Sequence, residues 1–386
     1  MLPKVEPEQP PRGQPVQITD VRAIPLAIPM RAQEPPSSWA SWCGKQLVVR
    51  VSTDDGVEGI GETFAYGSPP AVAAAIEDAL RPLLLGRDPT RVEELTILLQ
   101  RSAVNYARRG LGLYAIGGVE MALWDLLGKI RGVPIYDLLG GLVRPRLRAY
   151  ASMMRYDSPD EVAVACRRLV ARGYTLLKLH QTDVESVRAA REAVGPEVGL
   201  MLDVNCPWSP SEAIEIARAL EPYDLRWLEE PVWPPEDYDG LARVRRGSRV
   251  PIATGENEGT VFGFRDLIAK GAADVLQPDI PKAGGIGETR KILALAEAAN
   301  LPVALHSWFY GPALAATLHV AAAMGGSMPV EIAEGELERS VLAAPIVVTD
   351  GWVEPPHGPG LGVALDEETL ARYPYTSDDS RPFLLR

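Results

Sequence analysis

The feature of this sequence that most restricts its fold is a series of short apolar runs, each of which ends on a polar or charged residue. From the second run onward, the runs end at Lys178 and His180, Asp203, Glu229, Glu256, Asp279, His306 and Glu331. Counted from Lys178, the steps between these positions are 25, 26, 27, 23, 27 and 25 residues, the length of one strand and one crossover helix. With a first strand over 148–152, the pattern predicts eight parallel strands that close into a (β/α)8 barrel.

The stretches between the apolar runs have helical periodicity. Apolar residues at three- and four-residue spacing predict helices over 160–172, 184–194, 211–220, 261–270 and 285–299. A doubly wound open sheet is the structural rival, but a dinucleotide-binding sheet needs a glycine-rich turn after its first strand, and none is present. We therefore predict an α/β chain with a modified barrel, in which the rhythm stops after Glu331 and the last helix is replaced.

The region before the barrel has a different pattern. Residues 18–28, 46–52 and 57–62 are rich in β-branched residues, and Asp54-Asp55-Gly56 between the last two runs predicts a hairpin. Helical spacing then follows over 70–84, 90–104 and 112–130. This order predicts an α+β domain over 16–140, followed by the barrel over 141–335.

Both ends of the chain lie outside these two units. Residues 1–15 are rich in proline and lack an apolar core of the kind found in signal peptides, so we expect a flexible lead-in. Residues 336–386 contain short β and turn patterns, and we expect this C-terminal segment to pack back on the first domain and complete it.

Composition narrows the class of partner. Acidic residues exceed basic ones by 51 to 39, which argues against a nucleic-acid or anionic membrane surface. The three cysteines have no spacing typical of disulfide or zinc sites, which favours a reducing, cytoplasmic location. The uncharged stretch 302–329 is long enough to span a bilayer, but His306, Gly311 and Pro312 interrupt it, so we predict a buried strand and a buried helix instead.

Three acidic strand ends predict a metal site. In a barrel the carboxyl ends of all strands meet at one mouth, so Asp203, Glu229 and Glu256 are expected in one pocket. Their mutual repulsion favours a hard cation, and oxygen ligands with open positions suit one Mg²⁺ ion. Any one of these acids alone is more typical of a solvated loop or a helix cap.

Two further groups of strand ends predict proton transfer. Lys178 and His180 are two residues apart on one strand and point to the same side, where they are candidate bases. Asp279 and His306 end neighbouring strands, and a carboxylate beside an imidazole fixes its tautomer and raises its basicity. No G-x-S-x-G nucleophile motif accompanies this pair. Bases on opposite sides of a metal-bound carboxylate predict abstraction of the α-proton and a metal-stabilised ene-diolate.

One long run resembles a known family. Residues 115–129 (AIGGVEMALWDLLGK) and 134–140 (PIYDLLG) resemble the signature of the mandelate racemase and muconate lactonising branch of the enolase superfamily, and the mandelate racemase subgroup in particular. The resemblance implies that Asp203 in Asp-x-Asn, Glu229 in Glu-Glu-Pro and Glu256 in Gly-Glu-Asn bind the metal. It also implies that Asp279 and His306 form the His-Asp dyad. Glu331 corresponds most simply to the family glutamate that hydrogen-bonds the substrate carboxylate, with Glu334 as the less favoured candidate.

The resemblance also implies a substrate-selecting cap and an assembly of subunits. Its closing loops are expected over 30–45 and 64–68, and the candidate substrate contacts are Asn205, Arg31, Tyr66 and Trp308. In the first of these loops, Ser37, Ser38 and Ser41 suit a polyol together with Arg31, whereas Trp39 and Trp42 suit an aromatic or apolar pocket together with Tyr66 and Trp308. The family commonly has Lys-x-Lys where this chain has Lys178 and His180. A histidine base is compatible with the same chemistry, but the resemblance then does not define the substrate or the face that is deprotonated. A homo-oligomer, from dimer to octamer, is the implied assembly.

Several functions follow from this pattern. The resemblance favours a lyase that dehydrates an acid sugar, so the expected partner is a small-molecule carboxylate. The alternative is a racemase or epimerase of an α-hydroxy acid. A barrel that binds a carboxylate without turning it over, and a metal-dependent hydrolase, remain as alternatives from other classes, although hydrolytic water activation favours histidine-rich ligation.

Overall fold

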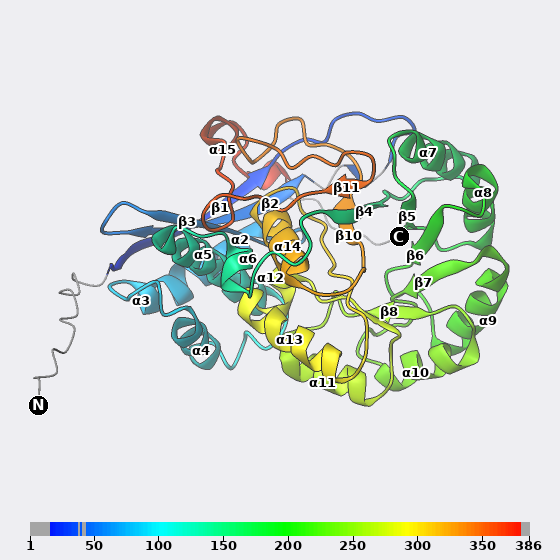
Figure 1. Ribbon diagram of the computed structural model, residues 1–386, viewed down its shortest axis with the longest axis horizontal. Helices are drawn as coiled ribbons and strands as arrows, with labels where there is room; N and C mark the ends of the chain where they lie inside the picture. The colour runs from blue at the N-terminus through cyan, green and yellow to red at the C-terminus, as the bar shows by residue number, and fades with distance from the viewer. Residues whose placement is uncertain (1–15, 38, 41–43, 380–386) are drawn as a thin grey trace, which may run out of the picture.

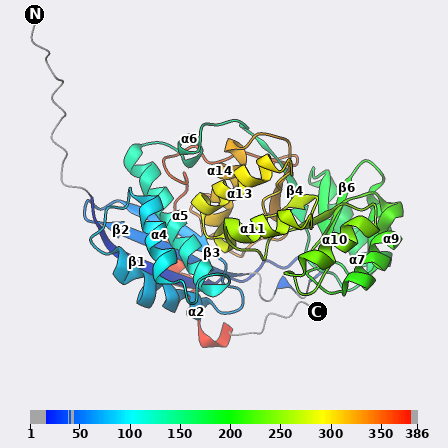
Figure 2. The ribbon, with the colours of Figure 1, turned by 90° about the horizontal axis from the view of Figure 1, so that it is seen from below.

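A computed structural model describes residues 16–37, 39–40 and 44–379. The predicted flexible lead-in over 1–15 lies outside the described residues, as do Ser38, Ser41, Trp42 and Cys43 of the first cap loop. The described chain forms a small α+β layer beside a barrel, and Figures 1 and 2 show the two units packed side by side.

The N-terminal unit is an antiparallel meander covered by helices. Strands β1 (Ile18–Ala27), β2 (Lys45–Thr53) and β3 (Glu58–Thr63) pair in that order, and Gly56 takes a positive φ of 83° in the β2–β3 turn. The predicted helix over 70–84 is one helical stretch, made of α2 (Pro69–Ala74), a π-helical turn (Ala75–Leu80) and α3 (Arg81–Leu84). The long helix α5 (Leu111–Arg131) packs on β3, and α4 (Val92–Ser102) packs on α5.

The barrel strands follow the predicted order. They are β4 (Leu147–Ser152), β5 (Leu176–Leu179), β6 (Gly199–Asp203), β7 (Leu225–Glu229), β8 (Ile252–Thr254), β9 (Val275–Leu276) and β10 (Val330–Ala333). Neighbouring strands are parallel from β4 to β9, and β10 pairs with β4. The predicted α/β class and barrel are thus confirmed.

The seventh predicted strand differs from the others. Among the described residues it pairs with its neighbour only through isolated bridges, Val303 with Leu276 and His306 with Asp279. The chain then turns into α14 (Pro312–Ala323). These two bridges are enough to bring His306 beside Asp279.

Helices cover the outside of the strands (Figure 1). They are α7 (Pro159–Ala171), α8 (Val184–Val194), α9 (Pro210–Leu220), α10 (Tyr238–Gly247), α11 (Thr260–Ala269) and α13 (Ile286–Ala298). The short helix α12 (Ile280–Ala283) instead packs against α5. Side chains fix several starts: Ser158 and Ser209 form capping boxes, and Asp183 and Asp237 accept first-turn N–H bonds. Helix α10 was not predicted, because it is short and rich in charged residues, and Leu241 and Val244 are the only large apolar side chains among its described buried residues.

The C-terminal segment touches both units. Strand β11 (Trp352–Val353) pairs antiparallel with β4, and no helix follows β10 in the position of an eighth barrel helix among the described residues. Farther on, α15 (Glu367–Arg372) leads to Pro374, which bridges to Leu26 of β1. Helix α6 (Ile135–Leu138) is tied to the same segment through the Ile135 N–H, which donates to the Gly360 carbonyl.

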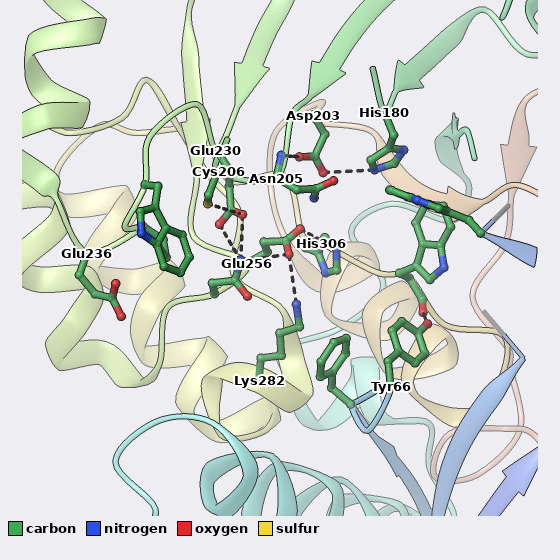
Figure 3. Close-up of a pocket in the computed structure, with 16 residues that line it drawn as sticks. Tyr66, His180, Asp203, Asn205, Cys206, Glu230, Glu236, Glu256, Lys282 and His306 are labelled. Atoms are coloured by element: carbon green, nitrogen blue, oxygen red, sulfur yellow. Dashed lines mark hydrogen bonds and ion pairs between the residues drawn. The ribbon is translucent and has the colours of Figure 1, made fainter. Parts of the chain in front are cut away.

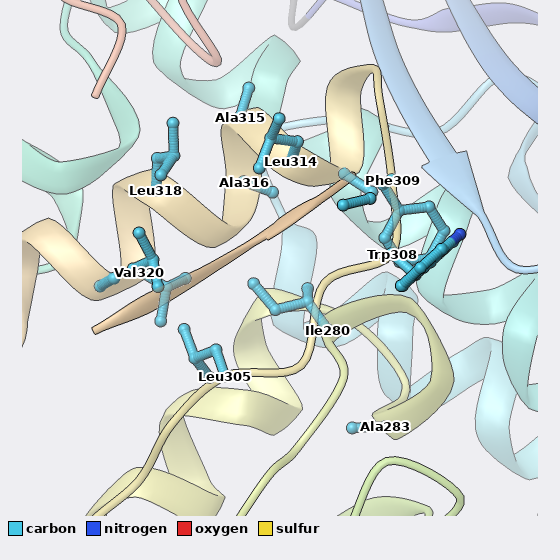
Figure 4. Close-up of a cluster of buried hydrophobic side chains, with 14 of the residues drawn as sticks. Ile280, Ala283, Leu305, Trp308, Phe309, Leu314, Ala315, Ala316, Leu318 and Val320 are labelled. Carbon is cyan, nitrogen blue, oxygen red and sulfur yellow. The ribbon is translucent and has the colours of Figure 1, made fainter. Parts of the chain in front are cut away.

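The apolar helices are buried in the interior. Among the described residues one helix, α5, is long and apolar enough to cross a membrane, but 83% of its most apolar window is buried inside the protein, as in the core helix of a globular domain. Within 302–329, residues Pro312 to Ala322 of α14 are all buried. Figure 4 shows Leu314, Leu318 and Val320 of α14 in one buried apolar cluster with Ile280 and Leu305.

Candidate active site

Three carboxylates converge at the mouth of the barrel. Asp203 and Glu229 are the last residues of β6 and β7, and Glu256 follows β8 by two residues. All three are buried, and one oxygen from each lies within 4.8 Å of the others. The structure therefore brings the sequence-predicted acids together.

The donor set fits a hard divalent cation. Three carboxylate oxygens from separate strands form an incomplete oxygen shell, which leaves room for water or substrate oxygens. Oδ2 of Asp203 is buried and has no hydrogen bond of good geometry among the described residues, and its neighbours are the nitrogens of His180 at 3.2 Å and Lys178 at 3.5 Å. Asp203, Glu229 and Glu256 are thus the residues that could hold Mg²⁺.

Lys178 lies within this cluster as a buried cation. Its Nζ is 2.9 Å from Glu229 Oε1, 2.7 Å from Glu331 Oε1 and 3.5 Å from Asp203 Oδ2. Burial alone would lower the pKa of Lys178, but the carboxylates of Glu229 and Glu331 raise it well above the usual value. Its ammonium therefore compensates the charge of the acids.

His180 is oriented by the main chain. Its Nδ1 bonds to the Met153 carbonyl oxygen, and because a carbonyl only accepts, Nδ1 carries the proton. Nε2 lies 3.2 Å from Asp203 Oδ2. The imidazole also contacts two indoles, with ring centroids 4.9 Å from Trp39 and 5.2 Å from Trp308.

His306 is oriented by a carboxylate. Its Nδ1 is 2.7 Å from Asp279 Oδ2, and its Nε2 is 3.0 Å from Glu256 Oε2. Burial would lower the pKa of His306, but the negative charges of Glu256 and Glu331 raise it well above the usual value. The second oxygen of Asp279 accepts the Lys282 N–H at the start of α12, which holds the carboxylate in place.

Glu331 and Glu334 have different surroundings. Glu331 pairs with Lys178 and accepts the Ser307 N–H at 2.8 Å. Burial would raise the pKa of Glu331, but Lys178 lowers it to about 2. Glu334 instead accepts the Met154 N–H and the Tyr156 hydroxyl and pairs with Arg168. Of the two, only Glu331 contacts the metal-site cluster through these interactions.

A cavity of about 310 Å³ opens over the cluster, a size typical of small-ligand sites. Asn205, Tyr66 and Trp308 line it, as do His180 and His306 (Figure 3). Asn205 takes a positive φ of 53° and its Oδ1 is buried without a hydrogen bond.

The structure does not place Arg31 in this cavity. Arg31 pairs with Glu336 at 3.2 Å and lines a separate pocket. The expectation that Arg31 contacts the substrate thus differs from the described arrangement, because the chain at Arg31 is bonded to the C-terminal segment, with its N–H donating to the Glu336 carbonyl.

Sequence reasoning missed several lining residues. They are Cys206, Glu230, Trp233, Pro235, Glu236, Asn257 and Lys282, whereas Phe64, which also lines the cavity, lies in the predicted loop over 64–68. Figure 3 shows Lys282 reaching from α12 towards Glu256, where its Nζ lies 3.2 Å from Oε1. Glu230 accepts from Asn257 Nδ2 and from the Cys206 thiol. The adjacent acids Glu229 and Glu230 were a sequence signal for Glu230. Lys282 gave no such signal, because it lies three residues beyond Asp279, the predicted end of its apolar run.

Comparisons with known proteins agree with this architecture. Residues 35–140 match the family model for the mandelate racemase / muconate lactonizing enzyme N-terminal domain, and residues 161–369 match the enolase C-terminal domain-like model. The chain is 33% identical to a D-galactarolactone cycloisomerase of Agrobacterium fabrum, over 85% of this chain and 90% of the relative. It is 35% identical to a D-galactonate dehydratase of Ralstonia nicotianae, over 87% and 92% respectively.

A solved structure shares the whole fold. The mandelate racemase/muconate lactonizing protein from Paracoccus denitrificans, complexed with magnesium, superposes with a TM-score of 0.84 at 30% identity, covering 93% of this chain and 98% of that one. The two family models together span both units of the described fold. The chain therefore belongs to the mandelate racemase and muconate lactonizing enzyme family of the enolase superfamily.

Proposed function

We propose that this protein removes the proton next to the carboxylate of a sugar acid and then expels an oxygen substituent from the neighbouring carbon. The observation that carries the proposal is the arrangement of two imidazoles around one acid cluster. His180 and His306 each commit Nδ1 to an acceptor and present Nε2 to a different carboxylate of the cluster.

The carboxylate cluster supports a magnesium requirement. Asp203, Glu229 and Glu256 would hold the ion, in line with the relative that was crystallised with magnesium. When bound, Mg²⁺ supplies positive charge that offsets the negative charge developing on the substrate carboxylate as its α-proton leaves.

The two histidines and Lys178 have different roles in this proposal. Asp279 holds the His306 ring so that Nε2 is the atom that takes or returns a proton, and the Met153 carbonyl does the same for His180. Lys178 stays protonated and lies between Glu229 and Glu331, so it serves as a fixed positive charge rather than as the base. This assignment narrows the sequence-based expectation, in which Lys178 was a candidate base together with His180.

Elimination of water is the reaction we favour. A base removes the α-proton, a double bond forms between the α- and β-carbons, and the β-hydroxyl leaves as water after it accepts a proton from an imidazolium. The enol then becomes a 2-keto-3-deoxy acid. The D-galactonate dehydratase among the relatives supports this outcome.

A second candidate differs only in the leaving group. If the β-oxygen belongs to a ring, the same elimination opens the ring and no atom is lost, so the product is an isomer. The D-galactarolactone cycloisomerase among the relatives favours this possibility.

Incubation with Mg²⁺ and a panel of open-chain and cyclic sugar acids in D₂O tests the proposal. Deuterium at the α-carbon of recovered substrate shows proton abstraction, and a 2-keto-3-deoxy product of lower mass by one water shows dehydration. An isomeric keto acid shows ring opening, and inversion without elimination shows a racemase or epimerase. No exchange and no product across the panel would contradict proton abstraction.

We also propose a cytoplasmic homo-oligomer, from dimer to octamer. The free cysteines Cys166 and Cys206 and the net charge of −12 support the location, and the family resemblance supports the assembly. Sedimentation velocity of the purified chain measures the assembly directly.

A further inference from the structure

Arg109 of the N-terminal unit makes a dense set of contacts with the barrel. It lies between α4 and α5, and its Nη2 is 2.8 Å from Glu258 Oε1, 2.9 Å from Glu258 Oε2 and 3.0 Å from the Tyr238 hydroxyl. Its Nη1 is 3.2 Å from Glu236 Oε1. One guanidinium thus joins two barrel loops that are separate in sequence.

Each of these segments is linked in sequence to a residue of the metal-site cluster. Glu258 is two residues after Glu256, in the loop between β8 and α11. Glu236 lies in the connection that follows Glu229, the last residue of β7, and Tyr238 is the first residue of α10. Arg109 therefore contacts the two chain segments that follow two of the three candidate magnesium ligands, two residues after Glu256 and seven residues after Glu229.

The same two loops are also joined inside the site. Asn257, between Glu256 and Glu258, donates from Nδ2 to both oxygens of Glu230, at 3.1 and 2.8 Å, and Glu230 follows Glu229 directly. Asn257 and Glu258 are thus neighbouring residues that both tie the β8–α11 loop to the β7–α10 connection, one through Glu230 and the other through Arg109.

The ion pair between Arg109 and Glu258 matters for the loop because the Glu258 carboxylate is buried. The Glu258 side chain is 5% exposed, while that of Arg109 is 40% exposed. Without the guanidinium, the Glu258 carboxylate would retain, within the part of the chain that the structure describes, only the Tyr238 hydroxyl and the Gly259 N–H as partners. A buried carboxylate that loses its cation tends to move towards water, and here that movement would carry the β8–α11 loop with it.

We propose that Arg109 is a positioning residue, through which the N-terminal unit holds the β7–α10 and β8–α11 loops in the geometry that binds magnesium. The proposal rests on the proposed function, because it assumes that Glu229 and Glu256 are ligands. Its consequence is that metal affinity depends on a side chain of the other unit that contributes no ligand.

Calorimetric titration of Mg²⁺ into the full-length protein tests the proposal, with R109M, R109K and R108M as variants. Arg108 is the matched control, since it is exposed and makes no side-chain hydrogen bond or ion pair among the described residues. R109M is expected to weaken Mg²⁺ binding about tenfold or more, and R109K by less, because an ammonium keeps the charge but loses the fork of donors. R108M is expected to bind like the wild type.

Steady-state kinetics on a sugar acid that the wild type turns over gives a second readout. R109M is expected to need more Mg²⁺ for half-maximal rate and to recover most of its kcat at saturating Mg²⁺, which general damage to the fold would not produce. If circular dichroism shows that R109M does not fold, R109K carries the test. Wild-type Mg²⁺ affinity in R109M, or in R109K when R109M is unfolded, would overturn the positioning role. Failure of the wild type itself to bind Mg²⁺ would instead overturn the proposed function.

Discussion

His180 and His306 present the same ring atom, Nε2, to the acid cluster, but different partners orient them. Asp279 gives His306 a charged acceptor, whereas His180 has only the neutral carbonyl of Met153. A carboxylate stabilises an imidazolium more strongly than a carbonyl does, so the two rings are not equivalent proton carriers.

The two rings are expected to serve opposite faces of the substrate. His306→Asn should abolish α-deuterium exchange for one enantiomer of an exchanged α-hydroxy acid, by roughly 10²-fold or more, and His180→Asn should do so for the other. Proton NMR in D₂O follows both enantiomers in one experiment. Equal loss of both exchanges in each variant would contradict the opposite-face assignment, and unchanged Mg²⁺ binding serves as the control for the fold of each variant.

Lys178 is expected to be essential for the fold of the barrel mouth. Lys178→Met leaves Glu229 and Glu331 buried without their cation, which should lower the free energy of unfolding by about 3–5 kcal/mol. Urea denaturation measures the change. Lys270→Met is the control, because Lys270 pairs with Asp239 on the surface and its loss should cost less than about 1 kcal/mol. A Lys178→Met protein as stable as the control would show that the acids do not need this charge.

The sequence predicted those site residues whose polar side chains stand at the ends of predicted strands. Asp203, Glu229, Asp279 and His306 follow that rule, and the structure places them together. Lys282 and Arg109 do not, because one lies on a helix after the strand and the other comes from the N-terminal unit. Contacts between segments far apart in sequence carry no periodic signal.

At the level of elements, buried carboxylates of the N-terminal unit bind the starts of barrel helices. Glu120 of α5 accepts the Ile286 and Gly287 N–H groups at the start of α13, each at 2.7 Å. Glu62 of β3 accepts the Ala313 N–H at the start of α14. The four N–H groups at a helix start lack partners within the helix, so these carboxylates supply acceptors from another unit.

The signature run over 115–129 therefore has a physical explanation. Besides Glu120, Asp125 accepts the Ile60 and Leu361 N–H groups, which joins α5 to β3 and to the C-terminal segment. A Cβ at Gly117 would lie 2.2 Å from the Pro281 carbonyl oxygen, so glycine allows α5 to approach α12 closely. The run predicted the family, but only the structure shows that it forms the contact between the two units.

Glu120 should make stability depend on pH. Burial raises the pKa of Glu120 from 4.5 to about 7 in the folded protein, although three hydrogen bonds oppose the shift. Below pH 4.5 the group is protonated in both states and carries no penalty. Between about pH 4.5 and 7 the folded state binds the extra proton, so its contribution to stability falls as pH rises, by up to about 3 kcal/mol.

Glu120→Gln is expected to flatten this dependence. The variant should show a smaller decrease in the free energy of unfolding between pH 4.5 and 7 than the wild type, measured by urea denaturation at several pH values. Glu192→Gln, at an exposed glutamate of α8 that pairs with Arg188, should leave the slope unchanged. An identical slope in Glu120→Gln and the wild type would show that this carboxyl does not carry the effect.

For the whole molecule, ligand binding and stability should be linked through the acid cluster. Removal of Mg²⁺ with a chelator is expected to lower the melting temperature, because an ion at about 100 times its Kd adds about 2.7 kcal/mol to the stability of the folded state. Differential scanning calorimetry measures the shift. In Glu256→Gln the shift should be smaller, since one ligand charge is lost, and an equal shift in both proteins would place the ion elsewhere.

The architecture of the whole chain was more predictable than its connections. The repeat of strand ends predicted the barrel, and the hairpin and helical patterns predicted the meander and its helices. The reduction of the seventh strand to two bridges was not predictable, because Val303 and His306 belong to an apolar run like the others. The same holds for β11, whose two residues pair with Leu147 and Arg148 at the start of β4, just before the residues that pair with β10.

The bridge between Leu26 and Pro374 joins the two ends of the described chain in one layer. A ribosome makes the chain from its N-terminus. The candidate ligands Asp203, Glu229 and Glu256, together with His180 and His306, are therefore synthesised before the C-terminal residues that pack on the N-terminal unit. A nascent chain that ends near residue 340 already contains every predicted ligand, yet it still lacks Leu361 for Asp125 and Pro374 for β1. The N-terminal unit therefore acquires these contacts only after residues 361–374 are synthesised. A chain terminated near residue 340 would contain the barrel residues of the site but would lack the C-terminal segment that packs on β1 and α5.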